Sequence, residues 1–282
     1  MIPASFDYVR AGSAEEAISL LGEHGDEAKF LAGGHSLLPL MKLRLARPGT
    51  LIDIGRLTEL RGVRDAGDHL AIGALTRHHD LNTDPVANEH CPLVAYAAGL
   101  VGDPQVRHRG TIGGSLAHGD PASDLPTICL TLDATIVARG PGGERQIAAK
   151  DFFNGFFETA LAADEIITEI RVPKTGSDGW SYLKFRQRAL DWDTVGVAAV
   201  VSGSNGSIGT ARIGLTNMGQ TPLRAAAAEA ALAGAPRDAV AQAAAKADEG
   251  TNPPADTWAS SDFRRHLVKV LTARAVGEAL SR

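Results

Sequence analysis

Two short stretches decide the fold of this chain, Ala32-Gly33-Gly34-His35-Ser36 and Thr111-Ile112-Gly113-Gly114-Ser115. Each places a pair of glycines between an apolar run and a predicted helix. Because glycine has no Cβ, its backbone approaches a ligand closely and adopts a positive φ, so that successive N–H groups converge on phosphate oxygens. One such pair alone is more typical of a plain tight turn. Two pairs in one chain predict one ligand held at two places.

The residues around both pairs extend them into two long motifs, at 30–44 and 109–124. With these motifs the chain resembles the flavin-carrying medium subunits of the molybdenum hydroxylases. The resemblance runs from the opening Pro3-Ala4-Ser5-Phe6-Asp7-Tyr8 to the C-terminal part. Within the family it is strongest to the medium subunits of aerobic carbon monoxide dehydrogenases. Many relatives have Asp or Asn where this chain has Ser115, which puts one side-chain contact to the cofactor in doubt.

The resemblance implies a function in electron transfer. It implies that the chain binds FAD noncovalently and takes electrons from two [2Fe–2S] clusters in a small subunit, after a molybdopterin-bearing large subunit has oxidised the substrate. An external acceptor such as a quinone then receives the electrons, and the complex is expected to be a dimer of heterotrimers, a heterohexamer. The same role in an aldehyde or N-heterocycle dehydrogenase is an alternative. Two rivals are an independent FAD-dependent oxidoreductase and a non-redox interaction subunit.

The implied fold class is α+β. It has a two-part FAD-binding domain of the vanillyl-alcohol-oxidase (PCMH) type, with subdomains at 1–54 and 55–173, followed by a smaller α+β domain at 178–282. The run Lys174-Thr175-Gly176-Ser177-Asp178-Gly179 is the best linker in the chain. After it, three β-rich runs precede three helical ones, which is typical of an α+β layer rather than a parallel βαβ sheet.

Local patterns place the elements. Ser13-Ala14-Glu15-Glu16 is a capping box that predicts a helix up to Glu23, before Gly25 ends it. Thr76 is a plausible N-cap for residues 77–82. Alternation and flanking turn residues predict the remaining elements: strands at 28–31, 50–54, 69–73, 135–139, 144–147, 165–172, 180–186, 195–201 and 208–216, and helices at 92–101, 122–132, 222–233, 236–249 and from 261 to the end.

The candidate cofactor contacts follow from the resemblance, position by position. His35 is expected near the pyrophosphate, against the alternative of a turn histidine facing solvent. Ser36 either donates to a phosphate or caps the next helix. Asp124 either bonds a polar part of the cofactor or caps the helix after it. The full set is Ala32, Gly33, Gly34, His35, Ser36, Thr111, Ile112, Gly113, Gly114, Ser115, Asp124, Ile167, Lys184 and Trp192.

Four of the other positions carry their own alternatives. Lys184 is expected to stabilise an anionic reduced flavin, or else to be a solvated strand lysine. Trp192 shields the flavin ring or anchors a loop. Ile167 packs on the adenine or flavin edge or simply fills the core. Thr76 approaches the flavin or caps a helix.

Composition and missing motifs exclude several classes of function. The formal charge of −5 argues against a nucleic-acid partner. Only two cysteines are present, Cys91 and Cys129, too few for an iron–sulfur cluster, and both are expected to be buried small hydrophobes. Rossmann, P-loop, G-x-S-x-G and H-E-x-x-H patterns are missing. We expect no catalytic acid, base or nucleophile in this chain.

A metal site and the cellular location complete the expectations. His118, Asp120 and Asp124 form the most metal-like cluster, but the turn around Gly119 and Pro121 suits loop shaping and FAD contacts better, so we expect no metal. The sequence has no run of about 18 apolar residues and no secretory signal pattern. A cytoplasmic location is therefore expected, with peripheral contact at the inner face of the cell membrane through the complex as an addition.

Overall fold

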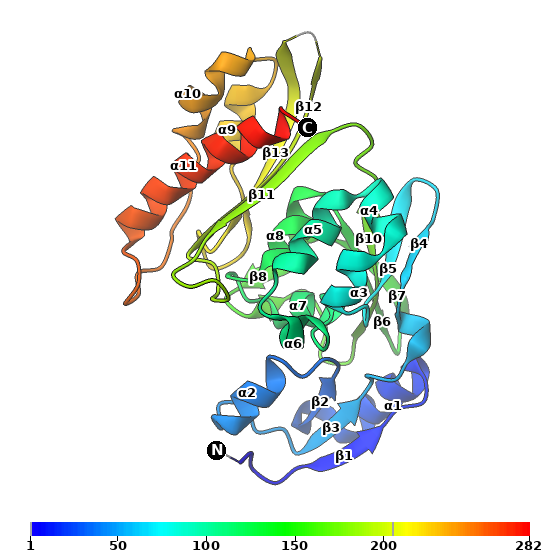
Figure 1. Ribbon diagram of the computed structural model, residues 1–282. Helices are drawn as coiled ribbons and strands as arrows, with labels where there is room; N and C mark the ends of the chain where they lie inside the picture. The colour runs from blue at the N-terminus through cyan, green and yellow to red at the C-terminus, as the bar shows by residue number, and fades with distance from the viewer. Residues whose placement is uncertain (1, 205) are drawn as a thin grey trace.

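Three larger β-sheets follow one another along the molecule in this computed structural model (Figure 1), and two short strands form a fourth, two-stranded sheet. The structure describes residues 2–204 and 206–282, so the first residue of the predicted N-terminal unit lies outside it. The N-terminal sheet lies at one end, the middle sheet in the centre and the C-terminal sheet at the other end. Within the described residues, no helix is both long enough and apolar enough to cross a bilayer.

The N-terminal sheet has the order β1-β3-β2, and all its pairings are parallel. One half of the predicted capping box forms, because the Ser13 side chain accepts a hydrogen bond from the Glu16 backbone N–H, while the Glu16 side chain accepts from the Gly12 N–H rather than from that of Ser13. Its elements are β1 (Asp7–Arg10), α1 (Ala14–His24), η1 (Gly25–Glu27), β2 (Ala28–Leu31), α2 (Leu37–Lys42) and β3 (Thr50–Asp53). The first glycine pair lies between β2 and α2, at the carboxyl end of β2.

The middle sheet is five-stranded and antiparallel, with the order β4-β5-β10-β6-β7. Strands β8 and β9 pair with each other in a separate two-stranded sheet. The elements of this middle part of the chain are η2 (Thr58–Leu60), β4 (Val63–Asp65), β5 (His69–Gly73), α3 (His78–Thr83), α4 (Pro85–His90), α5 (Pro92–Leu100), α6 (Pro104–Arg107), α7 (Ile112–His118), α8 (Asp124–Thr131), β6 (Thr135–Gly140), β7 (Gly143–Ala148), η3 (Ala149–Asp151), β8 (Phe153–Gly155), β9 (Glu158–Thr159) and β10 (Ile166–Pro173).

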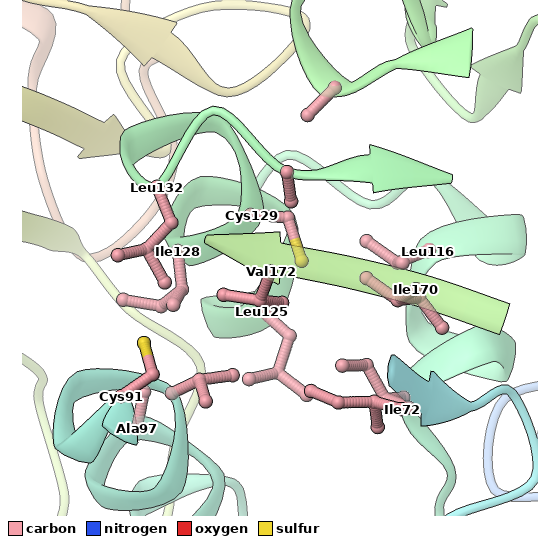
Figure 2. Close-up of a cluster of buried hydrophobic side chains, with 14 of the residues drawn as sticks. Ile72, Cys91, Ala97, Leu116, Leu125, Ile128, Cys129, Leu132, Ile170 and Val172 are labelled. Carbon is pink, nitrogen blue, oxygen red and sulfur yellow. The ribbon is translucent and has the colours of Figure 1, made fainter. Parts of the chain in front are cut away.

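The largest apolar cluster fills the space between this sheet and its helices (Figure 2). Both cysteines belong to it and neither forms a disulfide. Burial raises the pKa of Cys91 to about 11 and that of Cys129 to about 12. The prediction that they are inert buried side chains is confirmed, since a thiol with so high a pKa forms little thiolate near neutral pH.

The C-terminal sheet has the order β11-β12-β13-β14, with antiparallel pairing throughout. Helix α11 packs along β11 and β12. A separate apolar cluster lies between the sheet and the helices. The elements are β11 (Gly179–Phe185), β12 (Val195–Ser204), β13 (Ser207–Thr216), β14 (Leu223–Arg224), α9 (Ala226–Leu232), η4 (Arg237–Ala239), α10 (Val240–Ala244) and α11 (Ser261–Ala279).

Several local predictions need correction. Thr76 is not the cap of α3; its hydroxyl bonds both the N–H and the carbonyl of Gly62, at 2.9 and 3.1 Å, and Arg77 is the N-cap. Ser123 rather than Asp124 is the N-cap of α8. The helix predicted at 222–233 begins only at Ala226, because Leu223 and Arg224 pair with β13 as β14. The helix predicted at 236–249 is reduced to η4 and α10.

Candidate functional site

Two cavities meet along a shared wall between the N-terminal and middle sheets. The first has a volume of about 290 Å³ and extends towards β11 and the loop after it. The second has a volume of about 440 Å³ and extends towards β2 and β10. The residues common to both are Gly33, Gly34, Ser36, Gly114 and His118. Both glycine pairs therefore contribute to the junction, which makes one long groove from segments far apart in sequence.

The two glycine turns touch each other through Gly33. A Cβ built on Gly33 would lie 2.9 Å from Gly110 Cα and closer still to the Arg109 carbonyl, so only glycine fits there. A Cβ on Gly113 would lie 2.6 Å from Ala74 Cβ. Of the four paired glycines only Gly34 has a positive φ, of 74°. The glycines at 33 and 113 are thus required by close packing and not by backbone conformation.

The backbone N–H groups of the two turns are used differently. Among the described residues, the N–H groups of Gly34, His35 and Ser36 donate no hydrogen bond within the chain. In the second turn four of the five N–H groups have an internal acceptor: Ile112 donates to Thr76 O, Gly113 to Ala74 O, Gly114 to Thr111 Oγ1 and Ser115 to Thr111 O. The second turn therefore differs from the first, since within the described part of the chain only its Thr111 N–H is left for a ligand. It offers space beside Gly114, while the first turn offers free donors.

The structure places the predicted residues along this groove with one exception. Ile112 is fully buried in the middle apolar cluster and lines neither cavity. His35 Nδ1 lies 3.1 Å from the Gly33 carbonyl, which holds its ring over the first turn. Ser36 is the N-cap residue of α2, but its side chain makes no capping bond. The predicted residues that line a cavity are Ala32, Gly33, Gly34, His35, Ser36, Thr111, Gly113, Gly114, Ser115, Asp124, Ile167, Lys184 and Trp192.

Lys184 is not a solvated strand lysine. Its side chain is 6% exposed, and its Nζ lies 2.6 Å from Asp124 Oδ1 and 2.8 Å from Asp193 Oδ1. Tyr182, two residues earlier on β11, lies with its Oη 2.7 Å from Asp124 Oδ1 and 2.8 Å from Asp193 Oδ2. Asp124 and Lys184 line the first cavity, whereas Asp193 and Tyr182 stand behind them. We call these four residues the acid–lysine cluster.

Burial and neighbouring charges set the proton affinities in the acid–lysine cluster. Burial and the nearby Asp124 carboxylate raise the pKa of Asp193 to about 8, against the opposing effect of Lys184. Burial lowers the pKa of Lys184, but the two carboxylates outweigh this and hold that pKa above its usual value. Burial, Asp124 and Asp193 raise the pKa of Tyr182 well above the usual range. Since carboxylates offset the ammonium, the cluster presents little net positive charge to the cavity.

His78, at the start of α3, is a cavity residue that sequence reasoning missed. It is 4% exposed, and its Nδ1 has no hydrogen-bond partner among the described residues. One edge of the ring packs against Gly110, where a Cβ would lie 2.9 Å from Nε2. Burial lowers the pKa of His78 to about 4, with Arg107 and His35 adding to the shift and Asp124 opposing it. The ring is therefore neutral near pH 7.

We expect His78 to make the folded protein acid-sensitive. Its pKa is about 4 when folded and ordinary, 6.5, when unfolded. The unfolded chain binds more protons between these values, so the free energy of unfolding rises with pH in this window and falls on acidification. The full effect is about 3 kcal/mol. Chemical unfolding measured across this window checks it: His78→Gln should flatten the slope, and the exposed His24→Gln should leave it unchanged. An unchanged slope in His78→Gln would contradict the assignment.

A second buried cation fixes the loop after β11. Arg264 on α11 is 1% exposed; its Nη1 donates to the Thr194 carbonyl, and its Nη2 donates to Asp256 Oδ2 at 2.6 Å. Asn217 Nδ2 donates to the Asp193 carbonyl at 2.7 Å. These bonds hold the backbone at the end of the loop that carries Trp192, whose own side chain is 61% exposed. Sequence alone gave no signal for the contact of Arg264 with this loop, because Thr194 is 70 positions away.

The side chains of His118, Asp120 and Asp124 do not come together as a set of metal ligands. Asp124 is engaged by Tyr182 and Lys184, while Asp120 accepts from the Ala122 N–H at 2.9 Å. His118 lines both cavities, and its ring lies 4.9 Å from that of Phe157. Within residues 2–204 and 206–282, no group of three or more His, Cys, Asp or Glu side chains is placed to hold a metal ion. His118 and Asp124 line the groove, whereas Asp120 lines neither cavity.

Comparison with known protein families gives two matches that together span nearly the whole chain. The FAD binding domain in molybdopterin dehydrogenase matches residues 4–175, and the CO dehydrogenase flavoprotein C-terminal domain matches residues 180–279. The first match contains both glycine turns and most of the groove. The second contains Lys184 and Trp192.

Individual relatives agree with these matches over full length. The carbon monoxide dehydrogenase medium chain of Hydrogenophaga pseudoflava is 42% identical, with 100% of this chain and 99% of the relative covered. The glyceraldehyde dehydrogenase medium chain of Sulfolobus acidocaldarius is 39% identical, with 99% of each covered. Among solved structures, the carbon monoxide dehydrogenase of Hydrogenophaga pseudoflava superposes with a TM-score of 0.97 at 45% identity, and quinoline 2-oxidoreductase of Pseudomonas putida 86 with 0.95 at 32%. Each structure match covers 100% of this chain and 99% of the other.

Proposed function

Because this chain belongs to the family of FAD-binding subunits of molybdenum-containing dehydrogenases, we propose that it is the flavoprotein subunit of an aerobic carbon monoxide dehydrogenase. Membership makes it an oxidoreductase subunit with FAD as its cofactor and electron transfer as its role. Carbon monoxide as the substrate is supported by the names of two relatives, at 42% and 40% identity. The names of others, a glyceraldehyde and a quinoline enzyme, keep an aldehyde or N-heterocycle substrate as the alternative.

The observation that carries the proposal is the junction of the two cavities. A dinucleotide needs two compartments joined at its pyrophosphate. We infer that the pyrophosphate lies at the shared wall, where the free N–H groups of Gly34, His35 and Ser36 are available to phosphate oxygens. The flavin half would occupy the cavity lined by Asp124 and Lys184. The adenosine half would occupy the more apolar cavity.

Each compartment matches the half assigned to it. Ala32 and Ile167 line the second cavity, and Ile167, 5% exposed, offers an apolar surface to a purine ring. Trp192 on the wall of the first cavity would cover the flavin ring, and Ser115 on the same wall offers a hydroxyl. When bound, FAD supplies the redox chemistry that side chains lack. The chain's own residues bind and orient it and set the polarity around it.

The remaining assignments complete the proposal. A large subunit would carry the molybdopterin cofactor, a small subunit would carry two [2Fe–2S] clusters, and the complex would be a dimer of heterotrimers. A quinone would accept the electrons, with the complex in the cytoplasm and in peripheral contact with the inner face of the membrane. We also propose domain limits of 1–54, 55–173 and 178–282, since each range contains one main sheet and most of one apolar cluster. The clusters cross these limits at a few residues, among them Leu57 and Ile166 in the N-terminal cluster and Tyr182 in the middle one.

We expect the bound flavin to be FAD, held noncovalently. Acid extraction of the purified complex followed by chromatography measures this directly. FAD should be released in full, because the proposed contacts are hydrogen bonds and packing contacts rather than covalent bonds, and no cysteine lines either cavity. Recovery of FMN would contradict the assignment of two compartments. Flavin that stays with the denatured chain would contradict noncovalent binding.

We expect substrate oxidation only in the presence of the partner subunits. This chain has two cysteines, both buried, which are too few for the thiolates of an iron–sulfur cluster. The isolated chain should not oxidise carbon monoxide, aldehydes or N-heterocycles, whereas the reconstituted complex should. Rapid mixing of the complex with substrate should show flavin reduction that depends on the iron–sulfur subunit. Turnover by this chain alone would instead identify an independent flavoenzyme.

A further inference from the structure

The hydrogen bonds within the acid–lysine cluster cannot all form if both carboxylates are ionised. Tyr182 Oη lies within hydrogen-bond distance of two acids, Asp124 Oδ1 at 2.7 Å and Asp193 Oδ2 at 2.8 Å. A phenol has one hydrogen, so it donates to one of them only. Thr216 does not supply a second hydrogen, because its hydroxyl donates to Thr127 Oγ1 at 2.8 Å. One of the two acids must itself be the donor to Tyr182.

Position within the fold selects Asp193 as that donor. Its side chain is 0% exposed, and it has no backbone N–H donor among its described contacts. Asp124 is 9% exposed, lines the cavity and is the first residue of α8, where the helix dipole favours a negative charge. We propose that Asp193 carries a proton on Oδ2 at neutral pH, and that Tyr182 can pass this proton to Asp124 at the cavity wall.

The transfer conserves protons and charge. The Asp193 O–H bond breaks as a new O–H bond forms at Tyr182 Oη, and the original Tyr182 hydrogen moves to Asp124 Oδ1. The negative charge passes from Asp124 to Asp193. Lys184 Nζ stays paired throughout, because it lies 2.6 Å from Asp124 Oδ1 and 2.8 Å from Asp193 Oδ1. No other reactant is needed within the cluster.

The charged and polar groups around Asp193 come from several elements. Lys184 and Tyr182 face it from β11, Asp124 from α8, and Asn217 binds its carbonyl, while Arg264 of α11 binds the next carbonyl along the chain. The pKa of about 8 that these surroundings give Asp193 agrees with the hydrogen-bond count. Delivery beyond Asp124 rests on the proposed function, because a flavin takes up protons when it is reduced.

Infrared spectroscopy of the full chain tests the bound proton without any cofactor. A protonated carboxylic acid has a C=O stretch well separated from carboxylate bands. Near neutral pH the wild type should show this band, and raising the pH through about 8 should remove it. Asp193→Asn should lack the band, Tyr182→Phe should keep it at a shifted frequency, and the exposed Asp238→Asn should match the wild type. A wild type without the band, or Asp193→Asn that keeps it, would overturn the proposal.

The flavin potential tests delivery to the cavity. In the three-subunit complex, the pH dependence of the FAD midpoint potential should change slope near pH 8, and this change should vanish in Asp193→Asn. If the midpoint potential of Asp193→Asn has the same pH dependence as that of the wild type, proton delivery from Asp193 to the cavity is ruled out. The infrared result on the protonation of Asp193 would still stand. A complex that binds no FAD would contradict the proposed function instead, and the infrared result on the chain would still decide whether Asp193 is protonated.

Discussion

Gly114→Val should weaken FAD binding by about 100-fold, because overpacking at a filled site costs about 1–3 kcal/mol. Gly114 lies on the wall shared by both cavities. The one atom within 4 Å of a Cβ built there is Thr111 Oγ1, at 2.8 Å, so the rest of a larger side chain would extend into the groove. Flavin content of the purified complex and the dissociation constant from flavin fluorescence measure the effect.

The control for this variant is Gly277→Val on the exposed side of α11, where a Cβ meets no atom within 4 Å. It should keep full FAD content. Gly33→Val and Gly113→Val are less selective, since their side chains would strike the backbone near Arg109 and the Ala74 side chain respectively. They should lower the free energy of unfolding together with FAD content. A folded Gly114→Val protein with full FAD would place the cofactor elsewhere.

Lys184→Met should lower the free energy of unfolding by about 3 kcal/mol, because it leaves the Asp124 carboxylate with no cationic partner in a buried site. Urea unfolding of the full chain gives the value. Lys174→Met is the matched control: its partner Asp65 is 44% exposed at 2.7 Å, and exposed pairs contribute at most about 1 kcal/mol.

Double variants distinguish which acid carries the unpaired charge. Lys184→Met combined with Asp124→Asn should recover most of the lost stability, because both charges are then removed. Combination with Asp193→Asn should recover little, since Asp193 is already neutral in the proposed state. Equal recovery by both double variants would mean that the two carboxylates share the charge equally. Recovery by Asp193→Asn alone would assign the charge to Asp193.

Much of the groove could be predicted because its walls come from continuous motifs. Paired glycines indicate that the backbone lies close to another group, and the motifs that flank them place each turn between particular elements. Longer strands such as β10 and β12 alternate or run apolar over enough residues to be detected. Short pairings such as β4, β8 and β9 have three residues or fewer, which carry no usable period.

The parts that could not be predicted depend on contacts between distant segments. Tyr182 and Asp124 are 58 positions apart, and Arg264 and Thr194 are 70 apart. Nothing in the sequence around Asp193 indicates that it is fully buried beside a second acid, and the burial of His78 cannot be told from its neighbours Arg77 and His79. The roles of the second glycine turn could also not be assigned from its sequence, because two of its N–H groups donate to the distant carbonyls of Ala74 and Thr76.

The contact between Gly33 and the Arg109–Gly110 backbone limits how this protein can be recombined with its relatives. A chimera that takes its first 54 residues from a relative replaces one side of this contact, which we call the joint. The relative's segment must have glycine at position 33 to pack against the backbone at 109–110. Exchanges at the linker after Pro173 leave that joint intact. The N-terminal and middle segments should therefore be inherited as one module, and the C-terminal segment should be the exchangeable part.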